Sequence, residues 1–242
     1  MSSDDRLRPA IAFIPARGGS KRLPRKNLAP FFGHPIIAHT IRAATESGCF
    51  ARVVVSTEDA EIAEVGRRYG AEVDARPPAL ADDRARVLDV CVEFLGREAA
   101  AGRDYTVLCA LYATAPLRSA ADIRATVALL DPGRCDFALA VTEYDLPPYR
   151  ALRRGMDGTL TPMWPDLAFA KSQDVPPLFV NNASTYAVSV ESFLRHLSFT
   201  GPGARGHVMP RSLTTDIDVA EDLEEARRKA EKLGWRNTGR PT

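Results

Sequence analysis

The chain has 242 residues, with 32 Lys and Arg against 31 Asp and Glu, and its formal charge at neutral pH is +1. This balance argues against general binding to nucleic acid or to an anionic membrane surface, because both need a strongly cationic surface. A chain of this length can bury a large core without a disulfide or a structural metal ion. Its four cysteines lack metal-ligand spacing, so we expect reduced and mostly buried thiols.

No segment of the sequence predicts secretion or a membrane span. The first nine residues are polar and lack the apolar run of a signal peptide. No apolar stretch approaches the ~20 residues that are needed to cross a bilayer. We therefore expect a cytoplasmic protein with neither a membrane nor a nucleic acid as its partner.

Apolar runs that fit strands alternate along the chain with patterns that fit helices. Strands are predicted at residues 10–15, 52–56, 71–74, 105–112, 136–142 and 185–189. Helices are predicted at residues 35–47, 59–69, 86–101, 121–130 and 219–233. This alternation predicts an α/β fold with a mainly parallel sheet, and an active site beyond the carboxyl ends of its strands.

The densest polar feature is the segment RGGSKRLPRKN at residues 17–27, here called the basic loop. It carries five cations directly after the first apolar strand. Its adjacent glycines, Gly18 and Gly19, let the backbone approach a ligand, and Arg and Lys side chains bind phosphate oxygens. We favour a polyphosphate site over a solvated basic loop. The spacing is neither a Walker A motif nor a dinucleotide fingerprint, which indicates another class of nucleotide-binding protein.

A pair of carboxylates, Asp216 and Asp218, is the second feature. In an extended segment two residues at this spacing project to the same side, where both can meet one hard cation. Mg²⁺ prefers one or two carboxylates together with phosphate oxygens and waters. Alternatively, either aspartate caps the helix that begins near residue 219. A helix cap and a metal ligand do not exclude each other.

Two other segments draw attention. The turn at residues 112–118 (YATAPLR) follows a strand, and its Thr114 and Arg118 are candidates for contacts with substrate hydroxyls or phosphate, although a plain turn explains it equally well. Residues 143–177 are rich in proline and aromatic residues, which is typical of a partner surface, a lid or an irregular covering loop. The histidines show no ligand spacing, and no Ser-His-Asp or Cys-His set predicts covalent hydrolase chemistry.

In this order, the features resemble the CMP-sugar-acid synthetases, the cytidylyltransferases of sialic, pseudaminic, legionaminic and Kdo acids. The family opening is I-P-A-R-x-x-S-K-x-x-x-x-K-N, and residues 14–27 fill every fixed place in it. Further matches are VVVSTED at 53–59, LADD at 80–83, TAPLR at 114–118 and DID at 216–218. Within the family the likeness is greatest to pseudaminic acid cytidylyltransferases, which residues 150–152 (RAL) and 172–174 (SQD) also suit.

The resemblance implies a single Rossmann-like nucleotidyltransferase domain over residues 1–242, whose insert at about 143–177 serves as a lid and contacts the partner of a homodimer. It implies transfer of CMP from CTP to the anomeric hydroxyl of a nonulosonic acid, with Mg²⁺ (or Mn²⁺) bound by Asp216 and Asp218. The implied catalytic residues are Arg17, Lys21, Asp216 and Asp218. The implied nucleotide-binding residues are Ala16, Arg17, Gly18, Gly19, Ser20, Lys21, Lys26, Asn27, Asp83, Thr114 and Arg118. The implied sugar-binding residues are Tyr112, Arg150, Lys171, Gln173 and Asn182.

Alternatives remain open for the acceptor and for the reaction. Residues 181–185 (NNAST) replace a D-A-G-Q-F-like stretch that the family has near the sugar, so a Kdo-type octulosonate or a phosphonate stays open as the acceptor. A glycosyltransferase that uses its D-x-D on a nucleotide sugar is less consistent with a basic loop after the first strand. A catalytically inactive nucleotide-binding regulator is less consistent with the intact Arg17, Lys21, Asp216 and Asp218.

Overall fold

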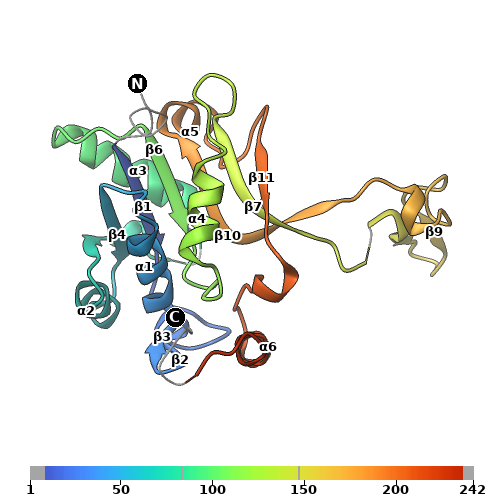
Figure 1. The fold of residues 1–242 in the computed structure, drawn as a ribbon, viewed down its shortest axis with the longest axis horizontal. Helices are drawn as coiled ribbons and strands as arrows, with labels where there is room; N and C mark the ends of the chain where they lie inside the picture. Colours follow the sequence, from blue (N-terminus) through green and yellow to red (C-terminus); the bar gives the residue numbers. More distant parts are fainter. Residues whose placement is uncertain (1–8, 83, 147, 237–242) are drawn as a thin grey trace.

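The computed structural model of the chain describes residues 9–82, 84–146 and 148–236. Its centre is a seven-stranded sheet with the order β11-β7-β10-β6-β1-β4-β5 (Figure 1). The strands are β1 (Ala10–Pro15), β4 (Arg52–Thr57), β5 (Glu72–Ala75), β6 (Val107–Leu111), β7 (Phe137–Glu143), β10 (Phe179–Ser189) and β11 (Arg205–Val208). Neighbouring strands are parallel except around β10, which is antiparallel to β6 and β7.

Helices cover both faces of the sheet, because successive side chains of a buried strand point to opposite faces. The helices are α1 (Ile36–Ser47), α2 (Ala60–Arg68), α3 (Val87–Ala100), α4 (Ala120–Val127), α5 (Val190–His196) and α6 (Ala220–Lys232). Ala12 and Ile14 of β1 pack in one hydrophobic cluster with α1, α2 and α4. Ile11 and Phe13 of the same strand pack in a second cluster with α3 and α5. The sheet therefore has one helical layer on each side.

A third hydrophobic cluster joins the end of the chain to its beginning. The short strands β2 (Pro30–Phe31) and β3 (His34–Pro35) pair directly after the basic loop. Phe31 packs with Ile217, with α6 and with Trp235 in this cluster. The N–H of Ile217 donates to the carbonyl of Thr114 at 3.0 Å, beyond the end of β6. This packing brings Asp216 and Asp218 to the carboxyl end of the sheet.

The predicted strands and helices are all present, with bounds that differ by a few residues in most cases. The largest difference is β10, which begins at Phe179 instead of Thr185 and runs antiparallel to its neighbours. The sequence did not predict β11 or α5, because β11 is a short edge strand with exposed polar residues and α5 has only seven residues. Short 3₁₀ turns lie at Lys26–Leu28, Pro78–Leu80, Pro148–Arg150, Ser172–Asp174 and Arg211–Leu213.

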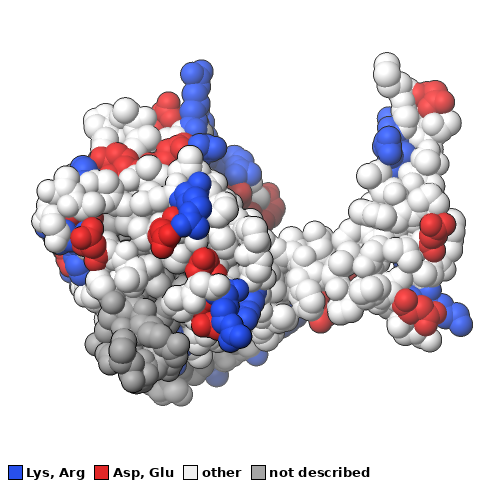
Figure 2. Space-filling view, turned by 90° about the horizontal axis from the view of Figure 1, so that it is seen from above, with Lys and Arg blue, Asp and Glu red and all other residues white. Residues whose placement is uncertain are grey.

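Residues 144–146 and 148–178, here called the arm, extend away from the sheet between β7 and β10. The arm carries the two-stranded hairpin of β8 (Leu152–Arg154) and β9 (Leu160–Pro162). Figure 2 shows the arm standing clear of the rest of the molecule. Apolar side chains lie open on it, and Leu146 and Phe169 are 80% and 91% exposed. Among the described residues, no helix is long and apolar enough to cross a membrane.

Candidate active site

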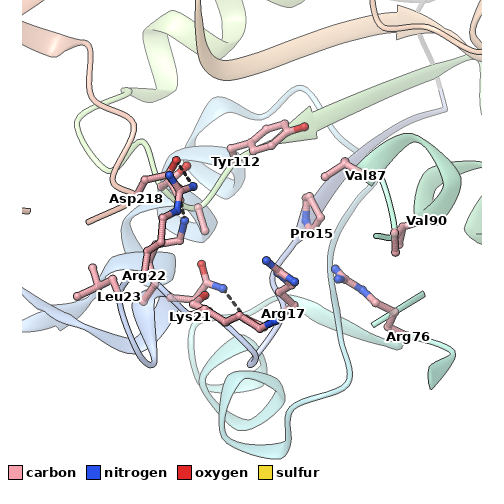
Figure 3. Close-up of a pocket in the computed structure, with 16 residues that line it drawn as sticks. Pro15, Arg17, Lys21, Arg22, Leu23, Arg76, Val87, Val90, Tyr112 and Asp218 are labelled. Carbon is pink, nitrogen blue, oxygen red and sulfur yellow. Dashed lines mark hydrogen bonds and ion pairs between the residues drawn. The ribbon is translucent and has the colours of Figure 1, made fainter. Parts of the chain in front are cut away.

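A cavity of about 270 Å³ lies beyond the carboxyl ends of β1 and β6 (Figure 3). The order of the strands reverses here, since β4 lies on one side of β1 and β6 on the other, and ligands of parallel sheets usually bind at such a point. The predicted site residues that line the cavity are Arg17, Ser20, Lys21, Lys26, Asn27, Tyr112, Thr114 and Asp218. Other lining residues include Pro15, Arg22, Arg76, Val87 and Val90. The structure therefore gathers residues of the three predicted motifs in one place.

The two ends of the basic loop are fixed by hydrogen bonds, the first beside β4 and the second at the wall of the cavity. The N–H of Ala16 donates to the carbonyl of Ser56 at 3.0 Å, which extends the pairing of β1 with β4 by one residue. The amide of Asn27, only 5% exposed, donates to the carbonyl of Arg17 at 2.9 Å and closes the base of the loop. Asn27 thus has a structural role at the wall of the cavity, and cationic side chains of the loop line that cavity.

The two predicted glycines have different surroundings. The N–H of Gly18 donates to a carboxylate oxygen of Glu58 at 2.7 Å. A Cβ on Gly18 would lie 2.3 Å from Oδ2 of Asp59, so only glycine fits there without a shift. A Cβ on Gly19 would meet no atom within 4 Å. The close approach that the glycines predicted is therefore found at Gly18, and it is to the protein itself.

Asp218 is held by two cations of the basic loop. Its Oδ1 accepts from Nζ of Lys26 at 2.7 Å, and its Oδ2 accepts from the guanidinium of Arg22 at 2.6 Å. Burial alone would raise the pKa of Asp218, but the hydrogen bond and charge of Lys26, assisted by Arg22, hold this pKa below its ordinary value. Asp218 is therefore ionised at neutral pH and compensates part of the positive charge of the loop.

Asp216 has a different environment on the same side of the chain. Ile217, between the two aspartates, is fully buried, so both carboxylates project away from the core. Desolvation raises the pKa of Asp216, the nearby Thr114 hydroxyl partly offsets this, and repulsion from Asp218 raises the pKa further. Thr114 Oγ1 is buried, yet it makes no hydrogen bond of normal geometry with any described residue. The Thr114 hydroxyl thus lies near the Asp216 carboxylate and still has capacity for a hydrogen bond.

The two aspartates do not cap α6. The N-cap position belongs to Val219, and the cap comes from Asp222, whose Oδ2 accepts from the N–H of Asp218 at 2.8 Å and of Val219 at 3.0 Å. The capping alternative is therefore wrong for both residues. The side chain of Asp218 instead lines the cavity and pairs with the basic loop.

The carboxylate pair fits a hard divalent cation. Desolvation raises the pKa of Asp216 most and repulsion from Asp218 adds to this, and a cation near both carboxylates would relieve the repulsion. Within the described part of the chain, no cluster of three or more His, Cys, Asp and Glu side chains could hold a metal ion. Two carboxylates alone are the donor set that Mg²⁺ combines with phosphate oxygens and waters. The site therefore suits a metal ion that arrives with a phosphate ligand.

Arg76, which was not among the predicted site residues, follows β5 and faces the cavity from the same side as Arg17 (Figure 3). Arg76 is 7% exposed, and its guanidinium donates to the carbonyl of Ser56 at 2.7 Å. Desolvation lowers the pKa of Arg76, the carboxylates of Glu58 and Asp74 oppose this, and Arg17 adds to it. Its position after the carboxyl end of a parallel strand was the signal that could have identified it.

Two half-buried phenols, Tyr112 in the cavity wall and Tyr186 beside it, lie near Asp216. Their rings are in contact in a tilted arrangement, with centroids 5.5 Å apart and an interplanar angle of 56°. Burial raises the pKa of both phenols, and the charge of Asp216 contributes to each shift. Both phenols are therefore protonated at neutral pH and act as hydrogen-bonding groups, not as bases. Only Tyr112 was among the predicted sugar-binding residues.

Arg118 and Asn182 lie behind this wall and do not line the cavity. Arg118 is 1% exposed, and its guanidinium donates to the carbonyls of Ser184 at 2.8 Å and Tyr112 at 3.3 Å. Asn182 is also buried, and its amide contacts Ser184 and the sulfur of Met209. Arg118 thus links the end of β6 to β10, and Asn182 links β10 to Met209 beyond β11. Both have a bracing role, because direct contact with a ligand needs exposure to the cavity.

The bulge in β10 was another feature that the sequence did not predict. The pairing with β7 changes register between Asn181 and Tyr186, and Ala183 takes a left-handed backbone with φ of 54°. The Asn181 amide meets the Tyr186 hydroxyl at the bulge, with Nδ2 to Oη at 2.6 Å. The segment that differs from the family pattern is therefore an irregular strand beside the cavity wall.

The remaining predicted residues are not at this cavity. Arg150, Lys171 and Gln173 lie on the arm, which leaves the body of its own chain. Asp216, Ala16, Gly18 and Gly19 adjoin the lining residues in sequence but do not line the cavity. Asp83 lies outside the described residues.

Comparisons with known proteins agree with this arrangement. The solved structure of CMP:2-keto-3-deoxy-manno-octonic acid synthetase complexed with CTP superimposes with a TM-score of 0.66 at 17% identity, covering 92% of this chain and 98% of that one. At this identity the likeness shows a shared fold. The sequence model of the family described as cytidylyltransferase matches residues 11–146. The chain belongs to this cytidylyltransferase family.

Two curated relatives extend the match over most of the chain. The pseudaminic acid cytidylyltransferase of Campylobacter jejuni subsp. jejuni serotype O:2 is 34% identical over 221 residues, which are 90% of this chain and 94% of that protein. The N-acylneuraminate cytidylyltransferase of Streptococcus agalactiae serotype V is 30% identical over 215 residues, 88% of this chain and 51% of that protein. The predicted family, fold class and enzyme class are confirmed.

Proposed function

We propose that the protein transfers CMP from CTP to the anomeric hydroxyl of a nonulosonic acid. The hydroxyl oxygen forms a bond to the α-phosphorus, the bond from this phosphorus to the bridging oxygen breaks, and pyrophosphate leaves with that oxygen. The hydroxyl proton is lost to the medium. The observation that carries the proposal is the cavity itself, where Arg17, Lys21 and Lys26 face the Asp216–Asp218 segment at the end of the sheet.

The cationic side chains account for most of the proposed catalysis. In phosphoryl-type transfer, charge grows on the leaving bridge oxygen and on the equatorial oxygens, and fixed cations stabilise it. Arg17 and Lys21 line the cavity where the basic loop forms its wall, and they would bind the triphosphate there. Arg76 reaches the same side from β5, and burial keeps it in one position.

Asp216 and Asp218 would hold Mg²⁺ (or Mn²⁺). A bound divalent cation supplies charge neutralisation for the phosphates of the nucleotide. The chain's own contribution is to fix two ionisable carboxylates on one side of an extended segment, through the burial of Ile217 and its hydrogen bond to Thr114. Lys26 and Arg22 keep Asp218 ionised for this purpose.

The acceptor is proposed to be a sugar acid of the pseudaminic or sialic type, because the curated relatives over 90% and 88% of this chain are named for such acids. Tyr112 contributes a protonated phenol to the cavity wall. The carboxylate and polar groups of the acid would meet Arg150, Lys171 and Gln173. Since these residues lie on the arm, we propose a homodimer in which each arm completes the cavity of the partner. The exposed apolar residues of the arm are the surface that such a contact would cover.

The test is release of pyrophosphate from CTP in the presence of Mg²⁺ and one acceptor at a time: pseudaminic, legionaminic or N-acetylneuraminic acid, or Kdo. We expect release with a nonulosonic acid and little with Kdo. Release with Kdo alone would replace the proposed acceptor by an octulosonate. Binding of CTP without release on any of the four would contradict the proposed reaction for these acceptors.

A further inference from the structure

Three carboxylates contact the basic loop from one side: Glu58 and Asp59 in the turn between β4 and α2, and Glu61 in the first turn of α2. Asp59 is the N-cap of α2, and its Oδ1 accepts from the N–H groups of Glu61 at 2.9 Å and Ile62 at 3.0 Å. The same side chain forms an ion pair with the guanidinium of Arg25. One carboxylate thus starts a helix and binds a cation of the loop.

Arg25 sits where the loop turns back toward the sheet. Its backbone is left-handed, with φ of 56° and ψ of 29°, a conformation that a residue with a side chain adopts only where its surroundings hold it. The N–H of Leu28 donates to the carbonyl of Arg25 at 2.8 Å, so the 3₁₀ turn that contains Lys26 and Asn27 begins from this residue. The conformation of Arg25 therefore sets where Lys26 enters the cavity.

The other end of the loop rests on the same turn. The N–H of Gly18 donates to Glu58 at 2.7 Å, and the space for a Cβ on Gly18 is filled by Asp59. Between these two anchored points lie Ser20 and Lys21, which line the cavity. Neither Asp59 nor Arg25 lines it. The turn thus contacts the loop at both ends from outside the cavity.

We propose that Asp59 is a positioning residue for the reaction: through Arg25 it holds the basic loop in the shape that presents Lys21 and Lys26 to the triphosphate. The proposal rests on the proposed function, since it assigns the loop to CTP. Asp59 acts through Arg25 and touches no substrate. The ion pair between Asp59 and Arg25 is here called the clamp. Without the clamp the basic loop would bind CTP more weakly, because the loop would have to become ordered when CTP binds.

The chain offers a substitution that separates the two roles of Asp59. Asparagine caps helices about as well as aspartate, so Asp59→Asn keeps the start of α2 and loses the charge that binds Arg25. We expect a melting temperature within about 2 °C of wild type. We expect the KM for CTP to rise about tenfold, with kcat changed less than about threefold. Pyrophosphate release at varied CTP and saturating acceptor measures both.

A second measurement does not depend on activity. Trypsin cleaves after Lys and Arg, and the loop contains Lys21 and Arg22 between its two anchored points. Loss of the clamp should raise the rate of cleavage at these sites about fivefold or more in the absence of substrate, because local opening becomes more frequent. Failure of the proposed function would silence the kinetic assay, whereas the cleavage rates would still support or overturn the clamp.

Two variants serve as comparison. Glu61→Gln removes an exposed carboxylate that also pairs with Arg25, at 2.7 Å, and should change the KM less than about twofold because exposed pairs are weak. Arg25→Gln should reproduce the effects of Asp59→Asn, and the double variant should lose no more than either single one.

Three results would overturn the proposal. The first is an unchanged KM for CTP and an unchanged cleavage rate in a folded Asp59→Asn protein. The second is a double variant whose KM rises by the product of the increases in the Asp59→Asn and Arg25→Gln proteins. The third is a rise in KM for Glu61→Gln as large as that for Asp59→Asn. Should Asp59→Asn fail to fold, Arg25→Gln leaves the cap of α2 intact, and its KM and cleavage rate decide the matter in the same way.

Discussion

Nζ of Lys26 lies 2.7 Å from Oδ1 of Asp218, which joins the end of the basic loop to the second carboxylate of the D-x-D pair, 192 residues away in sequence. Arg22 binds the other oxygen of the same carboxylate. The cations and the carboxylates of the site thus compensate each other before a substrate arrives. A triphosphate would add negative charge to this balance, and a divalent cation would offset that charge.

Lys21 lines the cavity between the two anchored points of the basic loop, and it is the proposed contact to the reacting phosphate. Lys21→Ala should lower kcat by about 100-fold or more, as for loss of one fixed charge in a transition state. Initial rates of pyrophosphate release at saturating CTP measure this. Lys232→Ala, at the exposed end of α6, is the matched control and should stay near wild type. Near-normal turnover of a folded Lys21→Ala protein would remove the residue from catalysis.

Asp218 is proposed to bind the metal ion, and its carboxylate also pairs with Lys26 and Arg22 of the basic loop. Asp218→Asn should raise the Mg²⁺ concentration for half-maximal rate about tenfold or more, and lower the rate at saturating Mg²⁺. A Mg²⁺ titration of initial rates tests both effects. Glu221→Gln, which removes an exposed carboxylate from the first turn of α6, is the control. An unchanged titration for Asp218→Asn would contradict the metal role.

Much of this site follows from local sequence. The basic loop comes directly after the apolar strand β1, and the YATAPLR turn comes after β6, so the rule for parallel sheets places both at one edge. Asp216 and Asp218 carry little information alone, since two aspartates before a helix also predict a cap. The structure separates these alternatives because Asp222 supplies the cap.

The features that the sequence did not predict depend on contacts between distant segments. Arg76 becomes a cavity residue only because β5 pairs with β4, which brings it to Ser56. Arg118 is a polar residue in a turn, and its burial follows from the position of the β10 bulge beside β6. The bulge itself lies in residues 181–185 (NNAST), which show no alternation of apolar and polar residues. Such placements are properties of the packed sheet, not of any local pattern.

The two glycines of the basic loop form a matched pair for a test of packing. Gly18→Ala should destabilise the protein by about 1–3 kcal/mol, because the new Cβ would overlap the Asp59 side chain. Gly19→Ala should leave stability nearly unchanged, since its Cβ would point into open space. Urea unfolding of both variants measures the difference. Equal effects of the two substitutions would mean that Gly18 and Asp59 are not in close contact.

Glu98 is the centre of an ion-pair cluster that links α3 to β4. It is 6% exposed and accepts hydrogen bonds from Arg103 at 2.8 Å, from the Tyr105 hydroxyl at 2.7 Å, and from Arg52. Arg103 and, after it, Tyr105 and Arg52 overcome the effect of burial and lower the pKa of Glu98 to about 2. The folded state therefore favours the ionised carboxylate.

A lowered pKa stabilises the folded protein above the ordinary pKa of glutamate, near 4.5, and this contribution is lost as the pH falls toward 2. Glu98→Gln should therefore destabilise the protein most at neutral pH. The difference between wild type and variant should shrink by up to about 2 kcal/mol between pH 6 and pH 3. Urea unfolding at several pH values measures it. A difference that is independent of pH would show that Glu98 gains nothing from its charged partners.

The proposed dimer makes a prediction about which chain supplies the arm. If each arm completes the cavity of the partner, one active site contains Lys21 from one subunit and Lys171 from the other. Lys21→Ala and Lys171→Ala then inactivate that site through different subunits. Each variant alone should be nearly inactive, whereas a refolded equimolar mixture contains heterodimers with one intact site. Random pairing makes half of the dimers mixed, with one of two sites restored, so about a quarter of wild-type activity should return.

The control for this experiment is a mixture of Lys21→Ala with Arg17→Ala, because both substitutions lie in the body of the chain and spoil both sites of every dimer. That mixture should stay inactive. Sedimentation of the wild type should show a dimer, and Phe169→Ser, which removes a 91% exposed apolar side chain from the arm, should weaken it about tenfold or more. Leu194→Ser, an exposed change on α5, should leave the dimer intact. If Lys21→Ala and Lys171→Ala recover no activity when mixed, each arm serves its own cavity or none.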